Sequence, residues 1–171
     1  MMISAFATDN ADEIVELKSD QGFPVGEFSI KYRPFLHEFL DDMMEKFELV
    51  VYSTFGPKHV QAIVDCIERR KKYFTYRFHE DFCLFANISS SVKCIDFLYG
   101  NRSKADIIVV DTRAKTLPLT VDNFVPISSY MGDDSKDREL VKLATILDKL
   151  SKEKDVTSAI KAYQTVTSSQ T

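Results

Sequence analysis

Two different spacings of apolar residues predict the elements in the first part of the chain. Apolar and polar residues alternate in segments 12–17 and 27–32, and a stretch with two glycines and a proline lies between them. This pattern predicts an antiparallel hairpin with one face in water. From Pro34 onward the apolar residues recur three and four positions apart, which predicts a helix that begins at this proline. The stripe that this helix is expected to bury comprises Phe35, Leu36, Phe39, Leu40, Met43, Met44 and Phe47.

The middle of the chain contains short apolar runs separated by turn residues. Residues 48–54 form an apolar run that is too short for a helix, and a helical stripe follows Gly56 and Pro57. This segment is therefore predicted to be strand, turn and helix. Residues 74–78 and 83–87 are expected to pair with each other as a second short hairpin.

The last part of the chain predicts two more strands and two helices. Residues 106–111 form the most continuous apolar run and are expected to be a strand buried on both faces, as in parallel sheets. Residues 124–128 predict a shorter strand. Helices are predicted over 140–150 and 156–163, with Asp155 as the N-cap of the second. Because strands alternate with helices, the fold class is predicted to be an α/β sheet with parallel central strands and right-handed crossovers.

Polar residues follow two of the predicted strands, at the carboxyl ends where such sheets place their sites. Ser53 and Thr54 follow the first buried strand, and their hydroxyl groups can bind an anion or cap the next helix. Asp111 and Thr112 close the later strand, where a charge is costly unless it is paired or coordinated. Lys93 lies between them in the chain and can pair with a phosphate or with Asp111, or lie at the surface.

Composition and charge narrow the class of protein. The chain has 171 residues, of which 44% are apolar and 28% charged, which is typical of one globular domain. A net charge of -4 argues against a nucleic-acid partner. No apolar stretch is long enough to span a membrane, and residues 1–20 do not show a basic start followed by an apolar core. We therefore expect no membrane segment and no secretion signal. Three cysteines without a CxxC pair fit a reducing compartment, so a nuclear or cytoplasmic location is expected.

The order of the polar residues resembles a known family. A hydroxyl closing one strand (Ser53), then a lysine (Lys93), then an aspartate closing the next long strand (Asp111), is similar to the second, third and fourth motifs of haloacid-dehalogenase-type phosphotransferases. Residues 12–163 resemble in particular the C-terminal-domain phosphatase branch, also called FCP-homology or NLI-interacting-factor-like. The segments that carry this resemblance are KYRPFLHEFL, ELVVYST, SVKCID, IIVVDT and DNFVPISSYMGDDSKDREL.

The resemblance implies a fold, a cofactor and roles for the site residues. The implied fold is a haloacid-dehalogenase-like three-layer α/β sandwich with parallel central strands and small inserted hairpins. In this family a D-x-D-x-T/V motif supplies a nucleophilic aspartate and an acid/base aspartate, and magnesium offsets the charge of the phosphoryl group. Ser53, Thr54 and Lys93 would contact the phosphoryl group, while Asp111 would hold Lys93 and support the metal. Thr112 departs from the Asn or Asp of active members and is a weak magnesium ligand.

The D-x-D motif itself is absent from this sequence. No two of its aspartates have this spacing, so we predict that the chain does not carry out the family's reaction. Met1 and Met2 align just after the motif, and the strand at the middle of the family's sheet is therefore expected to be missing. Segments 50–51 and 108–110 would then have unpaired backbone groups. We favour an incomplete version of a longer protein over a short variant that has abandoned catalysis, because losing a central strand is costly.

Three functions are compatible with these residues. The leading hypothesis is a phosphatase-like domain of the protein serine/threonine phosphatase type, with a phosphoprotein or peptide as partner and no turnover without the D-x-D motif. A rival is the non-catalytic presequence-receptor subunit of the mitochondrial inner-membrane translocase, which shares this domain and would place the protein in mitochondria. A third is a scaffolding pseudophosphatase. Residues 1–11 are expected to be the start of a shortened chain, 12–163 the domain, and 164–171 a disordered tail.

Overall fold

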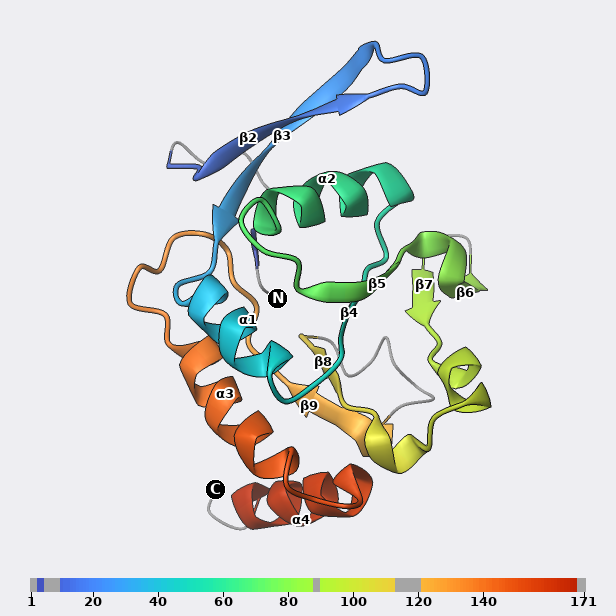
Figure 1. Ribbon diagram of the computed structural model, residues 1–171, viewed down its shortest axis with the longest axis vertical. Coiled ribbons are helices and arrows are strands. Elements are labelled where there is room, and N and C mark those ends of the chain that lie inside the picture. Colours follow the sequence, from blue (N-terminus) through green and yellow to red (C-terminus); the bar gives the residue numbers. More distant parts are fainter. Residues whose placement is uncertain (1–2, 5–9, 88–89, 113–120, 169–171) are drawn as a thin grey trace.

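The computed structural model describes residues 3–4, 10–87, 90–112 and 121–168 of the chain (Figure 1). Its strands are β1 (Ile3–Ser4), β2 (Glu13–Lys18), β3 (Pro24–Tyr32), β4 (Leu49–Tyr52), β5 (Phe74–Phe78), β6 (Cys83–Asn87), β7 (Ser90–Lys93), β8 (Val109–Asp111) and β9 (Phe124–Pro126). Its α-helices are α1 (Leu36–Met44), α2 (Pro57–Ile67), α3 (Glu139–Leu150) and α4 (Val156–Ser168). None of the helices in these ranges is long and apolar enough to cross a membrane.

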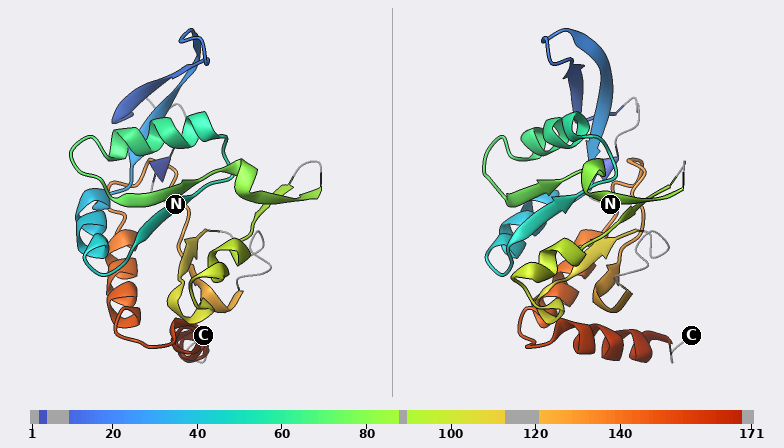
Figure 2. Two further views of the ribbon diagram at one scale, coloured as in Figure 1. Left: turned by 45° about the vertical axis from the view of Figure 1, so that its right-hand side comes forward. Right: turned by 90° about the vertical axis from the view of Figure 1, so that its right-hand side faces the viewer.

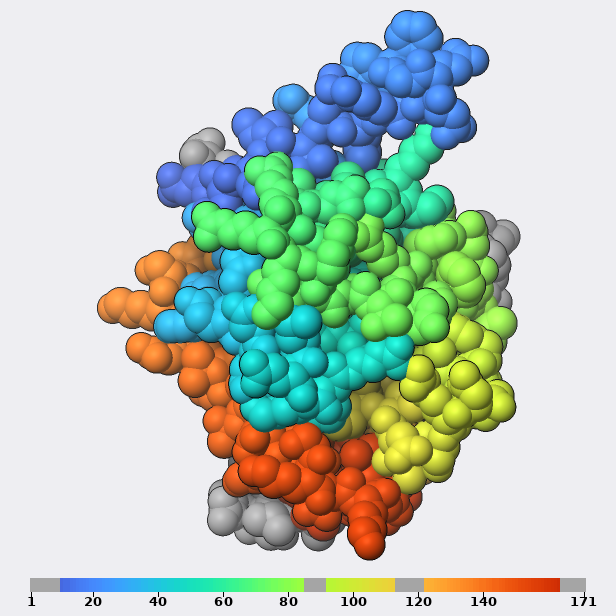
Figure 3. All heavy atoms as spheres, viewed as in Figure 1, coloured from blue at the N-terminus to red at the C-terminus, as the bar shows by residue number. Residues whose placement is uncertain are grey.

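Strands β2 and β3 form the first predicted hairpin. They pair antiparallel, with Val15 opposite Phe28. Val15 and Ile30 are buried together with Cys66 of α2, whereas Ile14 is 70% exposed on the opposite face. The alternation of apolar and polar residues therefore places one face of the hairpin on α2 and the other in water. The far end of the hairpin projects from the rest of the molecule (Figure 3).

Strand β4, helix α2 and strand β5 form a parallel crossover unit. The predicted helix is present and begins at Pro57, which the sequence had placed in the preceding turn, and β5 runs parallel to β4. The expected second hairpin is therefore wrong, because residues 74–78 pair with β4 and residues 83–87 pair antiparallel with β7. The apolar stripe of α2 explains the difference. Burying it on the sheet returns the chain to the end where β4 began, so the next strand runs parallel to β4.

Strands β8 and β9 form a second parallel pair. Asn123 is fully buried, and its side-chain amide donates to the carbonyls of Lys104 and Ile107 at 2.6 and 2.8 Å. These bonds tie the start of β9 to the segment before β8. Residues 109–111 are only half-buried, so the expected burial of this strand on both faces is wrong. The reason is that, among the residues that the structure describes, β8 has a strand neighbour on one edge only.

No described strand lies between β4 and β8. The pairs β4–β5 and β8–β9 are separate two-stranded sheets, seen side by side in Figure 2. Both pairs nevertheless pack against the same hydrophobic core, through Leu49 of β4, Val110 of β8 and Ile108, which directly precedes β8. Val50 of β4 is 37% exposed. Within the described residues, β4 pairs only with β5 and β8 pairs only with β9. The other edge of β4 and of β8, called the inner edge, therefore lacks a strand partner, as the sequence predicted.

Helices α1, α3 and α4 cover the main hydrophobic core. Helix α1 packs on α3. It begins at Leu36 and not at Pro34, because Phe35 adopts a left-handed backbone with φ of 65°. The buried residues of this core are Leu36, Leu40, Met43, Ile67, Tyr73, Val125, Ile127, Leu140, Leu143, Leu147, Leu150, Val156 and Ile160.

Helix α4 is longer than the sequence predicted. Asp155 caps it as expected, because one carboxylate oxygen accepts the backbone N–H groups of Thr157 and Ser158 at 2.9 and 3.2 Å. The helix continues to Ser168, so the expectation of a disordered tail from residue 164 onward is wrong for its first part. Once a helix is nucleated, adding residues of moderate propensity costs little. Residues 169–171 lie outside the described ranges.

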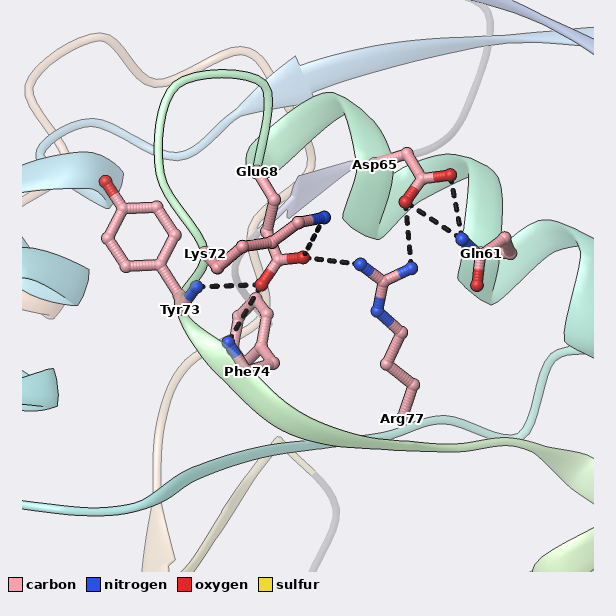
Figure 4. Close-up of polar contacts among 7 residues, drawn as sticks. All are labelled: Gln61, Asp65, Glu68, Lys72, Tyr73, Phe74 and Arg77. Carbon is pink, nitrogen blue, oxygen red and sulfur yellow. Dashed lines mark hydrogen bonds and ion pairs between the residues drawn. The ribbon is translucent and has the colours of Figure 1, made fainter.

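A charged network at the end of α2 holds the start of β5 (Figure 4). The Glu68 side chain is buried and accepts the backbone N–H groups of Tyr73 and Phe74, each at 2.8 Å. It also pairs with Lys72 at 3.1 Å and with Arg77. Burial alone would raise the pKa of Glu68, but these donors outweigh it and lower the pKa to about 2. The carboxylate thus fixes the turn that brings β5 alongside β4.

Replacing Glu68 by glutamine should remove an acid-dependent part of the stability. The pKa of Glu68 is lower in the folded chain than its ordinary value of 4.5, so its contribution is complete above pH 4.5 and is lost as the pH falls toward 2. A shift of this size corresponds to a contribution on the order of 3 kcal/mol. Urea unfolding at several pH values measures it. The wild type and the exposed control Glu153→Gln should lose stability between pH 4.5 and 2 by more than Glu68→Gln does; parallel curves would contradict the assignment.

Candidate functional site

Lys93 and Asp111, at the ends of β7 and β8, form an ion pair. The Nζ atom of Lys93 lies 2.6 Å from Oδ2 of Asp111, and both side chains are largely buried, with 16% and 14% exposed. The other oxygen of Asp111 accepts the backbone N–H of Thr112 at 2.6 Å. Pairing with Asp111 was one of the alternatives that the sequence left open for Lys93, and the two residues do meet. Their roles toward a phosphoryl group stay predictions.

Tyr52, the last residue of β4, holds the segment that carries Lys93. Its ring centroid lies 5.7 Å from Nζ of Lys93. Its hydroxyl group donates to the carbonyl of Phe82 and accepts the backbone N–H of Cys94 at 3.1 Å. Burial raises the pKa of the Tyr52 hydroxyl, which therefore stays protonated. Sequence analysis did not identify Tyr52 as a site residue. Its position at a strand end, directly before Ser53, could have indicated this role.

Ser53 and Thr54 follow Tyr52, and Ser53 makes local contacts. The Ser53 hydroxyl oxygen accepts the backbone N–H of Phe55 at 3.1 Å, a contact within the turn and not a helix cap, because Gly56 is the N-cap of α2 and no side chain caps this helix. This bond leaves the hydroxyl proton for another acceptor. The Ser53 carbonyl lies 3.9 Å from Sγ of Cys83, and Cys83 is the strand partner of Lys93. Ser53 is therefore connected to the ion pair through its neighbours, while Thr54 is exposed.

The described residues do not fit a magnesium site. Magnesium needs several oxygen ligands in octahedral geometry, usually including one or two free carboxylates. Both oxygens of Asp111 are engaged, one by Lys93 and the other by the backbone of Thr112. In the described part of the chain no three His, Cys, Asp or Glu side chains are grouped so that they could hold a metal ion. The predicted metal ligands Asp111 and Thr112 are therefore insufficient by themselves.

Two hollows in the surface of the described residues lie away from this pair. One of about 550 Å³ lies between β2 and α2 and includes Lys18 and Lys58, and another of about 690 Å³ lies in the segment from Ser128 to Lys142. Neither is lined by Lys93 or Asp111. The ion pair, and not a deep cavity, therefore defines the candidate site.

A second buried ion pair joins β3 to the segment before α3. The guanidinium group of Arg33 is fully buried and binds Asp137 through two hydrogen bonds of 2.9 and 2.7 Å. It also donates to the carbonyl and the hydroxyl of Ser128 at 2.8 and 2.9 Å, and its carbon centre lies 5.5 Å from the ring of Tyr130. Arg33 lowers the pKa of Asp137. This cluster is structural, because every contact that defines it holds one chain segment against another.

Comparison with known proteins identifies relatives of this chain. The family model described as NLI interacting factor-like phosphatase matches residues 2–157. The human CTD small phosphatase-like protein is 30% identical over 151 residues, which cover 88% of this chain and 52% of that protein. Nuclear envelope morphology protein 1 of Schizosaccharomyces pombe is 30% identical over 135 residues, which cover 77% of this chain and 28% of that protein.

The fold also matches a solved structure. The fission yeast RNA polymerase II CTD phosphatase Fcp1 superimposes with a TM-score of 0.58 at 17% sequence identity, over 95% of this chain and 52% of that one. This likeness shows a haloacid-dehalogenase-like α/β fold, as predicted. The chain spans about half or less of the length of these relatives.

Proposed function

Because the chain belongs to the NLI interacting factor-like phosphatase family, we propose that this domain binds phosphoserine or phosphothreonine segments of proteins without hydrolysing them. The proposal rests on the ion pair between Lys93 and Asp111, which lie at the ends of β7 and β8. The sequence contains this pair but not the two aspartates of a D-x-D motif. A lysine ammonium group has three N–H donors. One of them is enough to bind Asp111, so Lys93 can use the others to bind a phosphate.

We expect no turnover, because the residues lack groups that the family's chemistry requires. The family's reaction requires one aspartate to attack phosphorus and another to protonate the leaving oxygen. No D-x-D pair exists in the sequence, and the described residues offer no magnesium site. The translocase-receptor alternative and the mitochondrial location that it implies stay predictions, as does a nuclear or cytoplasmic location.

We expect the purified 171-residue chain to bind a phosphoserine peptide and to release no phosphate from it or from an aryl phosphate with magnesium. Calorimetry measures the binding, and a phosphate assay measures the release. The double variant Lys93→Ala with Asp111→Asn should lose at least about tenfold in affinity without leaving a buried carboxylate unpaired. Lys18→Ala, on the exposed hairpin, is the matched control. Magnesium-dependent turnover, or binding unchanged by the double variant, would refute the proposal.

A further inference from the structure

Exposed aromatic side chains adjoin the candidate site. This aromatic patch comprises Tyr52, Tyr76, Phe78, Phe82 and Phe97. Phe78 is its centre, and its ring centroid lies 4.9 Å from those of Phe82 and Phe97. Tyr76, Phe82 and Phe97 are 50%, 42% and 45% exposed. Contiguous apolar surface of this kind marks an interaction site more often than scattered apolar residues do.

The alternation of β5 explains why these rings reach the surface. Arg77 points toward α2, where it pairs with Asp65 at 2.8 Å and with Glu68 (Figure 4). Successive side chains of a strand point to opposite faces, so Tyr76 and Phe78 project away from α2. The two short 3₁₀ helices Glu80–Phe82 and Asp96–Gly100 add Phe82 and Phe97 to the same surface.

The charges next to the aromatic patch are acidic. From Tyr76 to Phe97 the sequence has three acidic residues and two basic ones: Arg77, which is paired with Asp65 and Glu68, and Lys93, which is paired with Asp111. Asp81 directly precedes Phe82; its side chain is 69% exposed and lies 3.5 Å from Nδ1 of His79, whose ring packs edge-on against Phe82. Asp96 directly precedes Phe97 and is also exposed. Two exposed carboxylates therefore neighbour Phe82 and Phe97 in the sequence, and this charge favours a cationic occupant of the patch over an acidic one.

We propose that the aromatic patch binds an arginine of the partner segment, close to its phosphorylated residue. A guanidinium group stacks on aromatic faces and pairs with carboxylates at the same time, which suits rings flanked by Asp81 and Asp96. Tyr52 belongs to the patch and also contacts Lys93, so the arginine site is continuous with the candidate phosphate site. The inference rests on the proposed function and adds the chemistry of the residues that flank the phosphate.

Fluorescence anisotropy with labelled phosphoserine peptides tests this inference. Each peptide carries one arginine at a different position from four residues before to four residues after the phosphoserine, and each has an alanine counterpart. In at least one position arginine should improve the affinity of the wild type by about tenfold. Phe97→Ser and Asp96→Lys should remove this preference while binding of the alanine peptides stays unchanged. Phe23→Ser, a control 66% exposed at the hairpin end, should keep it.

The outcomes separate this inference from the proposed function. If no position shows an arginine preference, or if the preference persists in both Phe97→Ser and Asp96→Lys, the inference is overturned. The same peptides without phosphate test the proposed function. Equal affinity with and without phosphate would overturn the proposed function and, with it, the placement of the arginine next to a phosphorylated residue.

Discussion

Replacing Arg33 by alanine should destabilise the chain by about 3 to 5 kcal/mol, the range measured when one partner of a buried ion pair is removed. The Arg33 side chain is 0% exposed, and it binds both oxygens of Asp137 and the carbonyl of Ser128. Alanine would leave the carboxylate and the carbonyl with fewer donors in a buried place. The midpoint of urea unfolding measures the loss. A change below about 1 kcal/mol would contradict this role.

Two further variants separate charge from packing in this test. Arg138→Ala removes a neighbouring arginine that lies 5.0 Å over the ring of Phe35 but is exposed, so we expect a change of at most about 1 kcal/mol. The double variant Arg33→Met with Asp137→Leu replaces the pair by apolar side chains of similar volume. Such replacements are often close to neutral, so the double variant should be more stable than Arg33→Ala alone.

The elements that the sequence predicted well are those with a strong local pattern. The buried part of the α1 stripe from Leu36 to Met43, the helix after Gly56, and the Asp155 cap of α4 each depend on residues near in sequence. The pairing of residues 74–78 was wrong because it depends on where α2 packs, which the alternation within a strand does not encode. Strand partners are set by tertiary packing, and a short strand fits several partners equally well.

The candidate site was predicted in part for the same reason. A carboxylate at the end of an apolar run needs a partner, and Lys93 was one candidate for it, a pairing that the family resemblance also implied. The sequence did not indicate the contributions of Tyr52 and Arg33, because an aromatic residue or an arginine next to a strand can have many roles. Only the fold shows that Tyr52 reaches Lys93 and that Arg33 meets a residue more than a hundred positions away.

Supplying a strand between β4 and β8 should stabilise the chain. The inner edges of β4 and β8 have no strand partner among the described residues, and Val50 is 37% exposed. An extended segment with the family's D-x-D-x-T/V motif, fused before Met1, would pair with both edges. Burying a fully exposed valine is worth about 1.5 to 3 kcal/mol, so covering the remaining third of Val50 adds roughly 0.5 to 1 kcal/mol, and a rise in melting temperature of roughly 1 to 4 °C is expected for a chain of this size. Calorimetry measures it.

The same fusion tests what the missing carboxylates do. A segment with N-x-N in place of D-x-D should stabilise the chain equally but give no magnesium-dependent phosphate release, whereas the D-x-D segment should give release, because it brings the nucleophile and the acid/base group. An equal melting temperature with and without either segment would show that the strand edges are not available. Thr112→Asp in the D-x-D fusion should raise the turnover further, because a carboxylate binds magnesium better than the threonine hydroxyl beside Asp111.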